Sequence, residues 1–408
     1  MKDNKLKNLP LGTSDFAVLR YANEIYVDKS DLVYELASTR RKYFLARPRR
    51  FGKSLLISTF ESLFTHGLRD FKGLAIEKLW VEETKFLVVR LDFSEIKFFS
   101  SPEEFSRKFA SLISRCFGTV GFQYVDDDLN SAAGQLSTWL QTLRLSSLVV
   151  LIDEYDAPLT GCLSKPQLFE DARKELSEFY ARIKSNDGAV RFFFMTGITK
   201  FNKTSIFSEL NNFSDLTLDV DYGTLLGYTH NEVEQYFGAY LDRASELLNK
   251  PRKELLSELT NHYDGFCFDE DASTHVYAPW STLNFLNRPS RGFQNYWYES
   301  AGNPTALQQY LKSHSLREPK DYFKPKFVSI PVLQATATDT AHVDDLVLLT
   351  QAGYLAIKEV GTDSFLVGYP NKEVSDSLAW LYRDKLLSSQ SVDQLGAMHL
   401  RSDLVQGN

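Results

Sequence analysis

The first half of the chain alternates short apolar runs with segments of helical periodicity, and this alternation limits the possible folds more than any other feature. Runs typical of buried strands lie at Tyr43–Ala46, Phe86–Phe93, Leu148–Ile152 and Val190–Met195, with a fifth candidate at Leu216–Val220. Between them, apolar residues recur at helical spacing in Lys53–Phe64, Ser101–Cys116 and Gln167–Lys184. Strands that alternate with helices build a mostly parallel sheet flanked by helices. The sequence therefore predicts an α/β fold, with the fully apolar run 148–152 near the centre of the sheet.

Composition and charge exclude several classes of protein. The chain has 408 residues, of which 43% are hydrophobic, and its 46 basic against 53 acidic residues give a net charge of −7. This balance argues against a general nucleic-acid coat, although a local basic patch stays compatible with nucleic-acid binding. The apolar runs are too short to span a bilayer, the N-terminus has no apolar signal segment, and the three cysteines form no disulfide or metal-binding pattern. We therefore expect a soluble cytoplasmic protein without a membrane partner.

The segment Arg47–Ser54 lies between a predicted strand and a predicted helix, and it ends like a phosphate-binding Walker A loop. Gly52 lets the backbone approach a phosphate, and the start of the helix directs free N–H groups at it. We expect Lys53 to reach the β- and γ-phosphates and Ser54 to place its hydroxyl on Mg²⁺. The first position, usually glycine, is Arg47, which fits only with a negative φ. The alternative is a solvated basic turn before an ordinary helix.

The other residues of the loop complete the predicted phosphate site. Three arginines add positive charge where a triphosphate would lie. The predicted nucleotide-binding residues of the loop are Arg47, Arg49, Arg50, Phe51, Gly52, Lys53, Ser54 and Leu55.

Two acids, Asp153 and Glu154, follow the apolar run 148–152 directly, about 100 residues after the loop. A central strand delivers them to the carboxyl edge of the sheet, where ligands bind in open α/β sheets. We expect Asp153 to hold Mg²⁺ together with Ser54, and Glu154 to polarise the attacking water as a general base. A strand followed by an acidic helix cap would explain the pair alone. Agreement of both motifs on one site favours a nucleotide site.

A third group of polar residues follows the run 190–195. Thr196 is the candidate for a sensor that contacts the γ-phosphate or the water. Lys200 is a candidate for a cation that stabilises the transition state, as are Lys203 and Arg191. A capped loop with solvated lysines is the alternative.

Several segments carry a resemblance to a known family: Leu11–Phe16, Tyr26–Ser30, Arg47–Leu55, Ile152–Asp156, Thr196–Asn212, Tyr263–Phe266, Asn295–Tyr298 and Tyr369–Val374. The chain resembles the AAA-ATPase-like proteins whose C-terminal part is a nuclease of the PD-(D/E)XK superfamily. The resemblance implies a P-loop NTPase core of the additional-strand (ASCE) type, followed by a helical or winged-helix-like region that closes over the nucleotide. It also implies that Arg47 is the usual first residue of the loop. Asp28 and Lys29 would lie near the base and ribose, although a surface strand is equally compatible with that segment.

The predicted organisation has four parts. Residues 1–225 form the P-loop ATPase core, 226–318 a helical lid-like region, 319–370 a small winged-helix-like module, and 371–408 the truncated start of a nuclease-type region. The late Glu318-Pro319-Lys320 has proline where a nuclease strand would need a ladder donor, so we expect no nuclease activity.

The leading functional hypothesis is Mg²⁺-dependent binding and hydrolysis of ATP that drives a conformational switch. The family resemblance suggests a link to nucleic-acid processing or defence, through a protein partner that the sequence does not identify. A non-hydrolysing nucleotide-bound scaffold and a small-molecule kinase remain as alternatives.

Overall fold

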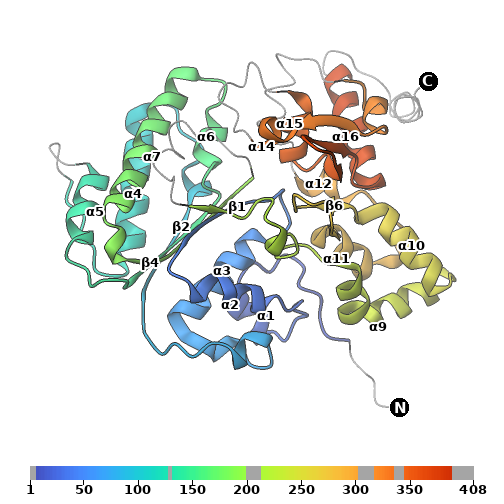
Figure 1. Cartoon of the computed structure of the whole chain (residues 1–408), viewed down its shortest axis with the longest axis horizontal. Helices are drawn as coiled ribbons and strands as arrows, with labels where there is room; N and C mark the ends of the chain where they lie inside the picture. Colours follow the sequence, from blue (N-terminus) through green and yellow to red (C-terminus); the bar gives the residue numbers. More distant parts are fainter. Residues whose placement is uncertain (1–5, 127–130, 199–212, 302–316, 335–343, 388–408) are drawn as a thin grey trace.

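A five-stranded parallel sheet forms the centre of the molecule (Figure 1). The computed structural model describes residues 6–126, 131–198, 213–301, 317–334 and 344–387. The strand order is β2-β3-β4-β1-β5, and every neighbouring pair is parallel. The bounds of the strands are β1 Lys42–Ala46, β2 Leu87–Asp92, β3 Leu148–Asp153, β4 Val190–Gly197 and β5 Ser214–Asp215. The predicted α/β fold class is confirmed.

Helices cover both faces of this sheet, because successive strand residues point to opposite faces. Tyr43 and Leu45 of β1 pack in one buried cluster with the helix that follows the loop, α3. Phe44 and Ala46 pack in a second cluster, on the face that α4, α5 and α7 cover. The helices of the core are α1 Phe16–Tyr21, α2 Ser30–Ser38, α3 Lys53–His66, α4 Pro102–Gly118, α5 Ala132–Leu140, α6 Ala157–Gly161 and α7 Pro166–Ser185.

Local sequence signals explain where the elements begin, with one exception. Ser101 caps α4 by accepting a bond from the Glu104 N–H, and Pro102 occupies the first turn. The predicted fifth strand at 216–220 is wrong: β5 pairs only at Ser214–Asp215. One more bond, from the Leu216 N–H to the Phe44 carbonyl, extends this pairing before the chain turns away.

The strand order brings three strand ends together. β4 lies between β1 and β3, which makes it the additional strand that the family resemblance implies. Ala46 at the end of β1 is level with Gly197 at the end of β4, and Ile152 of β3 is level with Met195. The residues that follow β1, β3 and β4 therefore share one edge of the sheet.

The second half of the chain is mainly helical. Its helices include α9 His230–Leu248, α10 Arg252–Tyr263, α11 Pro279–Asn287, α12 Tyr296–Ala301 and α16 Lys372–Leu387. Thr229 and Glu232 form a reciprocal capping box at the start of α9. A buried cluster joins α9–α11 to the N-terminal residues Leu9, Ile25 and Val27. The N-terminal segment thus packs against the helical region.

The C-terminal part of the described chain also holds a small antiparallel sheet, β8-β10-β9. Its hairpin turns at Gly361, whose N–H donates to the Ser364 carbonyl at 2.7 Å. The bounds of its strands are β8 Lys326–Ser329, β9 Ala356–Val360 and β10 Ser364–Gly368, and the neighbouring helices are α14 Ile330–Gln334 and α15 Asp345–Gln351. A separate two-stranded antiparallel sheet consists of β6 Phe266–Cys267 and β7 His275–Val276. Within the described ranges, no helix is both long and apolar enough to cross a membrane.

Candidate nucleotide-binding site

The loop between β1 and α3 turns at two residues with left-handed backbone. Arg50 has a φ of 66° and Gly52 a φ of 96°. Gly52 is also the N-cap of α3, so the first free N–H groups of this helix face the loop. A glycine adopts such a φ at little cost, whereas the Arg50 backbone is strained. Arg47 has the negative φ that a residue other than glycine needs at the first position of the loop.

A cavity of about 420 Å³ opens over the loop. Its walls come from the loop, from the N-terminal segment, from the end of β3 and from α11. The lining residues are Pro10, Gly12, Thr13, Ser14, Arg49, Arg50, Gly52, Lys53, Ser54, Leu55, Glu154, Tyr228, Pro279, Trp280 and Leu283. The guanidinium of Arg50 lies over the Trp280 ring, 4.6 Å from its centre. The structure therefore brings six of the eight predicted loop residues to one cavity, together with Glu154.

Lys53 is buried at the start of α3, with only 6% of its surface exposed. Its Nζ donates to the carbonyl oxygens of Arg47 at 3.0 Å and Pro48 at 2.9 Å. Burial lowers the pKa of the ammonium, whereas the carboxylates of Asp153, Asp156 and Glu154 act to raise it. The ammonium therefore lies within electrostatic reach of three acids at the sheet edge.

Asp153 is buried at the end of β3, and two groups fix one of its oxygens. Its Oδ1 accepts from the Thr196 hydroxyl at 2.7 Å and from the Glu154 N–H at 3.0 Å. Neither bond engages Oδ2. Thr196 is completely buried and its hydroxyl is bound to Asp153, so it does not line the cavity in this structure. Its role as a phosphate sensor stays a prediction.

Glu154 is half-buried beside the loop and has a φ of 49°. Burial is the main cause that raises the pKa of its carboxyl, and the nearby Asp156 and Asp153 raise it further. Lys53 and Arg49 act in the opposite direction. A carboxylate with a raised pKa accepts a proton more readily near neutral pH, as a general base must.

Sequence reasoning assigned no role to two charged residues of this edge. Asp156 is buried, and its carboxylate accepts from the Ile198 N–H. Lys97, in the segment that follows β2, has a pKa lowered mainly by burial and then by Arg49, whereas Glu154 and Asp156 act to raise it. Its place just beyond the end of a predicted strand was the available signal, because such ends meet at one edge.

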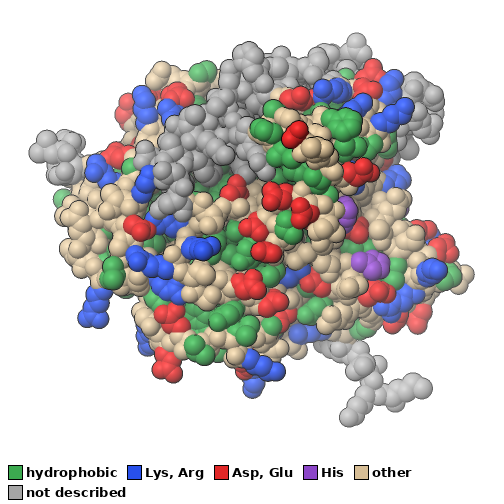
Figure 2. All heavy atoms as spheres, in the orientation of Figure 1, with side chains coloured by type: hydrophobic (Ala, Val, Ile, Leu, Met, Phe, Trp, Pro, Cys, Tyr) green, Lys and Arg blue, Asp and Glu red, His purple; other side chains and the backbone are tan. Residues whose placement is uncertain are grey.

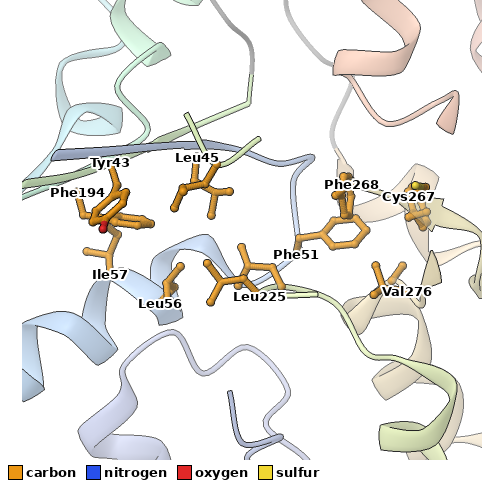
Figure 3. Packing of buried hydrophobic residues seen from close by; sticks show 14 of the residues in the cluster. Tyr43, Leu45, Phe51, Leu56, Ile57, Phe194, Leu225, Cys267, Phe268 and Val276 are labelled. Carbon is orange, nitrogen blue, oxygen red and sulfur yellow. The ribbon is translucent and has the colours of Figure 1, made fainter. Parts of the chain in front are cut away.

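Two loop residues, Arg47 and Phe51, use their side chains elsewhere, and their contact with phosphate stays a prediction. The Arg47 guanidinium donates to the carbonyls of Ala46, Thr217 and Tyr222 and lies over the Phe268 ring. Phe51 is buried and packs edge-on against Phe268, 5.1 Å between ring centres (Figure 3). The large side chains therefore anchor the loop from behind.

The carboxylate of Asp28 binds backbone groups, and its place near the base stays a prediction. Its two carboxylate oxygens accept from the backbone N–H groups of Ser30 and Ala75. Its neighbour Lys29, paired with Glu232 at 2.6 Å, lines a smaller, mainly apolar cavity of about 90 Å³. This cavity shares Pro10, Gly52, Leu55, Tyr228 and Pro279 with the larger one. Lys200, the predicted cation, lies outside the described residues.

The donor set at the edge of β3 suits a cation that a nucleotide brings with it. Among the described residues, no group of three or more His, Cys, Asp or Glu side chains could hold a metal by itself. Mg²⁺ in nucleotide sites takes one or two protein ligands and completes its shell with phosphates and water. Asp153, with Oδ2 not used by its two fixed bonds, and Ser54 at the cavity fit that pattern.

Comparison with known proteins identifies the family. The model of the family described as "Predicted AAA-ATPase" matches residues 10–207. The "Uncharacterized protein in vnfD 5'region" of Azotobacter chroococcum mcd 1 is 31% identical over 379 residues, which cover 91% of this chain and 69% of that protein. The crystal structure of Cdc6p from Pyrobaculum aerophilum aligns over 94% of this chain and 96% of its own at 12% identity, but its TM-score of 0.34 is too low to support an argument. On the family match and the relative, this chain belongs to the predicted AAA-ATPases.

Proposed function

We propose that this chain binds ATP with Mg²⁺, hydrolyses it, and uses the cycle as a conformational switch. One observation carries the proposal: the Lys53 ammonium interacts electrostatically with three carboxylates at the sheet edge, those of Asp153, Glu154 and Asp156. This cluster lies beside a glycine-containing loop, over which a cavity of about 420 Å³ opens. That volume lies in the range of cofactor sites.

The phosphates would bind over the loop. The free N–H groups at the start of α3 and the Lys53 ammonium supply donors to them. Arg49 and Arg50, which line the cavity, add positive charge. The adjoining apolar cavity between the N-terminal segment and α3 suits a nucleobase, because its walls are mainly hydrocarbon.

The metal and the water would lie at the end of β3. Ser54 and Asp153 would hold Mg²⁺, which neutralises charge on the phosphate oxygens when it is bound. Thr196 keeps Asp153 oriented through its 2.7 Å bond. Glu154 would accept the proton of the attacking water, and its raised pKa supports that step.

The switch would begin at Lys53. Its ammonium is held by two carbonyls of the loop, so it must exchange these bonds to reach a phosphate. Phe51 of the same loop packs against Phe266, Phe268 and Trp297, at 4.9, 5.1 and 6.3 Å between ring centres. A change in the loop would therefore reach β6 and α12 through packed rings.

The biological setting is also part of this proposal. We propose a cytoplasmic protein with a protein partner, linked to nucleic-acid processing or defence. Acidic and basic side chains are interspersed over the face shown in Figure 2, so charge does not point to a nucleic-acid surface there.

Phosphate release by the purified chain tests the proposal. We expect steady release from ATP with Mg²⁺ and none when the metal is removed with a chelator. ATP binding without release would favour the scaffold. Transfer of the γ-phosphate to an acceptor other than water would favour a kinase.

A further inference from the structure

A separate cavity lies behind the loop, where the sheet edge meets β6 and the C-terminal antiparallel sheet. It has a volume of about 60 Å³ and is lined by Arg47 and Pro48 of the loop, by Ile198 after β4, and by residues of β6, α15 and β9. Its walls are mainly apolar, with Leu218 and Phe266 among them. Ligand cavities are common at such junctions between structural units.

Two residues that line this cavity each carry a buried donor atom without a hydrogen bond to any described residue. These atoms are the Nε of Arg47 and the Nε2 of Gln351. Buried donors are almost always paired with protein, water or ligand. Their presence on one cavity points to an occupant that carries hydrogen-bond acceptors.

The charge on Arg47 narrows the chemistry of that occupant. Its hydrogen bonds to described residues go to neutral carbonyls, of Ala46 at 2.9 Å, Thr217 at 2.7 Å and Tyr222 at 3.3 Å. The charge of Asp215 raises the pKa of Arg47, and the Oδ1 of Asp215 accepts a hydrogen bond from the Thr217 N–H. Burial lowers the pKa of the guanidinium to about 9. A buried cation bound to neutral groups favours an anionic ligand.

We infer that this cavity binds a small monocarboxylate of roughly two or three carbons, with its carboxylate on Arg47 and Gln351 and its hydrocarbon end against the apolar wall. The size follows from the volume, since 60 Å³ exceeds the need of a single water, whereas a cavity that takes benzene is roughly 150 Å³.

The same backbone links this cavity to the proposed nucleotide site. The carbonyls that hold Lys53 Nζ belong to Arg47 and Pro48, whose side chains line the carboxylate cavity. A bound carboxylate would neutralise charge near the loop and hold those carbonyls in place. This coupling, which rests on the proposed function, predicts that a saturating carboxylate raises the Kd of ATP at least about threefold.

Calorimetric titration of the full chain with sodium propionate tests the binding. Propionamide is the neutral probe of matched shape, and sodium chloride controls ionic strength. We expect saturable propionate binding and at least about tenfold weaker binding of propionamide. No saturation by about 50 mM propionate would mean a cavity that holds only water, and equal binding of both probes would remove the role of charge. Either result overturns the inference without variants.

Three variants locate the binding. Ala356→Val narrows the cavity and Gln351→Leu removes one donor, so each should weaken propionate binding at least about fivefold while folding is checked by circular dichroism. Lys53→Met removes an ammonium that, among the described residues, binds only the carbonyls of Arg47 and Pro48, so it should weaken propionate binding less than Ala356→Val does. If propionate binding were lost in Lys53→Met and kept in full in Ala356→Val, the anion would bind at the phosphate loop, and the inference would be overturned. An unchanged Kd of ATP would overturn only the coupling, and failure of ATP to bind would contradict the proposed function independently of propionate.

Discussion

Replacement of Glu154 by glutamine tests the proposed base most sharply. Glutamine keeps the size of the side chain and has the same backbone preferences, so the φ of 49° at this position costs both residues alike. The change removes the proton acceptor, which is worth about 10²–10⁴ in rate, or roughly 2.7–5.4 kcal/mol of barrier. We therefore expect kcat for ATP to fall at least about a hundredfold.

Binding should respond in the opposite sense. Glu154 is one of three carboxylates near Lys53, and its removal lowers the negative charge that a triphosphate meets. ATP affinity should stay equal or increase. Phosphate release measures kcat, and a fluorescent ATP analogue measures the Kd. Glu170→Gln, which alters a surface pair with Arg173 on α7, is the matched control and should change neither. Glu154→Gln with unaltered kcat would refute the assignment of the base.

Other parts of the structure predict further effects. Thr196→Val leaves Asp153 without its buried hydroxyl donor, so kcat should fall about tenfold and the free energy of unfolding should fall by about 1–3 kcal/mol. Thr196→Ser should retain both values. Normal turnover in the valine variant would contradict the proposed positioning of Asp153 by Thr196. Phe51→Ala opens a void among three rings and should cost about 3–5 kcal/mol in denaturant unfolding, with Phe51→Leu clearly milder. Glu373 is buried and its pKa is raised from 4.5 to about 8, chiefly by that burial, so the folded state binds the proton more tightly and stability should fall as pH rises from 4.5 to 8. Glu373→Gln should flatten this pH dependence in thermal unfolding, and an unchanged slope would argue against it.

The sheet and the loop could be predicted because their signals are local. Four apolar runs and the strand–loop–helix order specify β1, β2, β3, β4 and α3, and the acids after the run 148–152 can only fall at the sheet edge. Periodicity does not say where a polar side chain at that edge points. From the sequence, the Thr196 hydroxyl could face either a phosphate or Asp153. It binds Asp153 because the fold brings together these two residues, which are 43 positions apart in the sequence.

The same limit explains the roles of Arg47 and Asp28. A run of arginines predicts positive charge, but Arg47 turns to the carbonyls of Thr217 and Tyr222, which lie 170 and 175 residues away in the sequence. Asp28 finds its second partner, the N–H of Ala75, 47 residues away. Such long-range partners leave no pattern in the local sequence. For the same reason, the local sequence does not predict the place of Lys97 or of the buried donors of Arg47 and Gln351.

The central claim is that the loop before α3 holds the phosphates of a nucleotide through Lys53. The most direct measurement is the Kd of Mg²⁺–ATP for the unmodified chain and for Lys53→Ala, each checked for folding. A charge-assisted bond to phosphate is worth about 1.5–3 kcal/mol, so affinity should fall by roughly 10- to 150-fold. Equal affinity in the two proteins, or no ATP binding by the unmodified chain, would contradict the account.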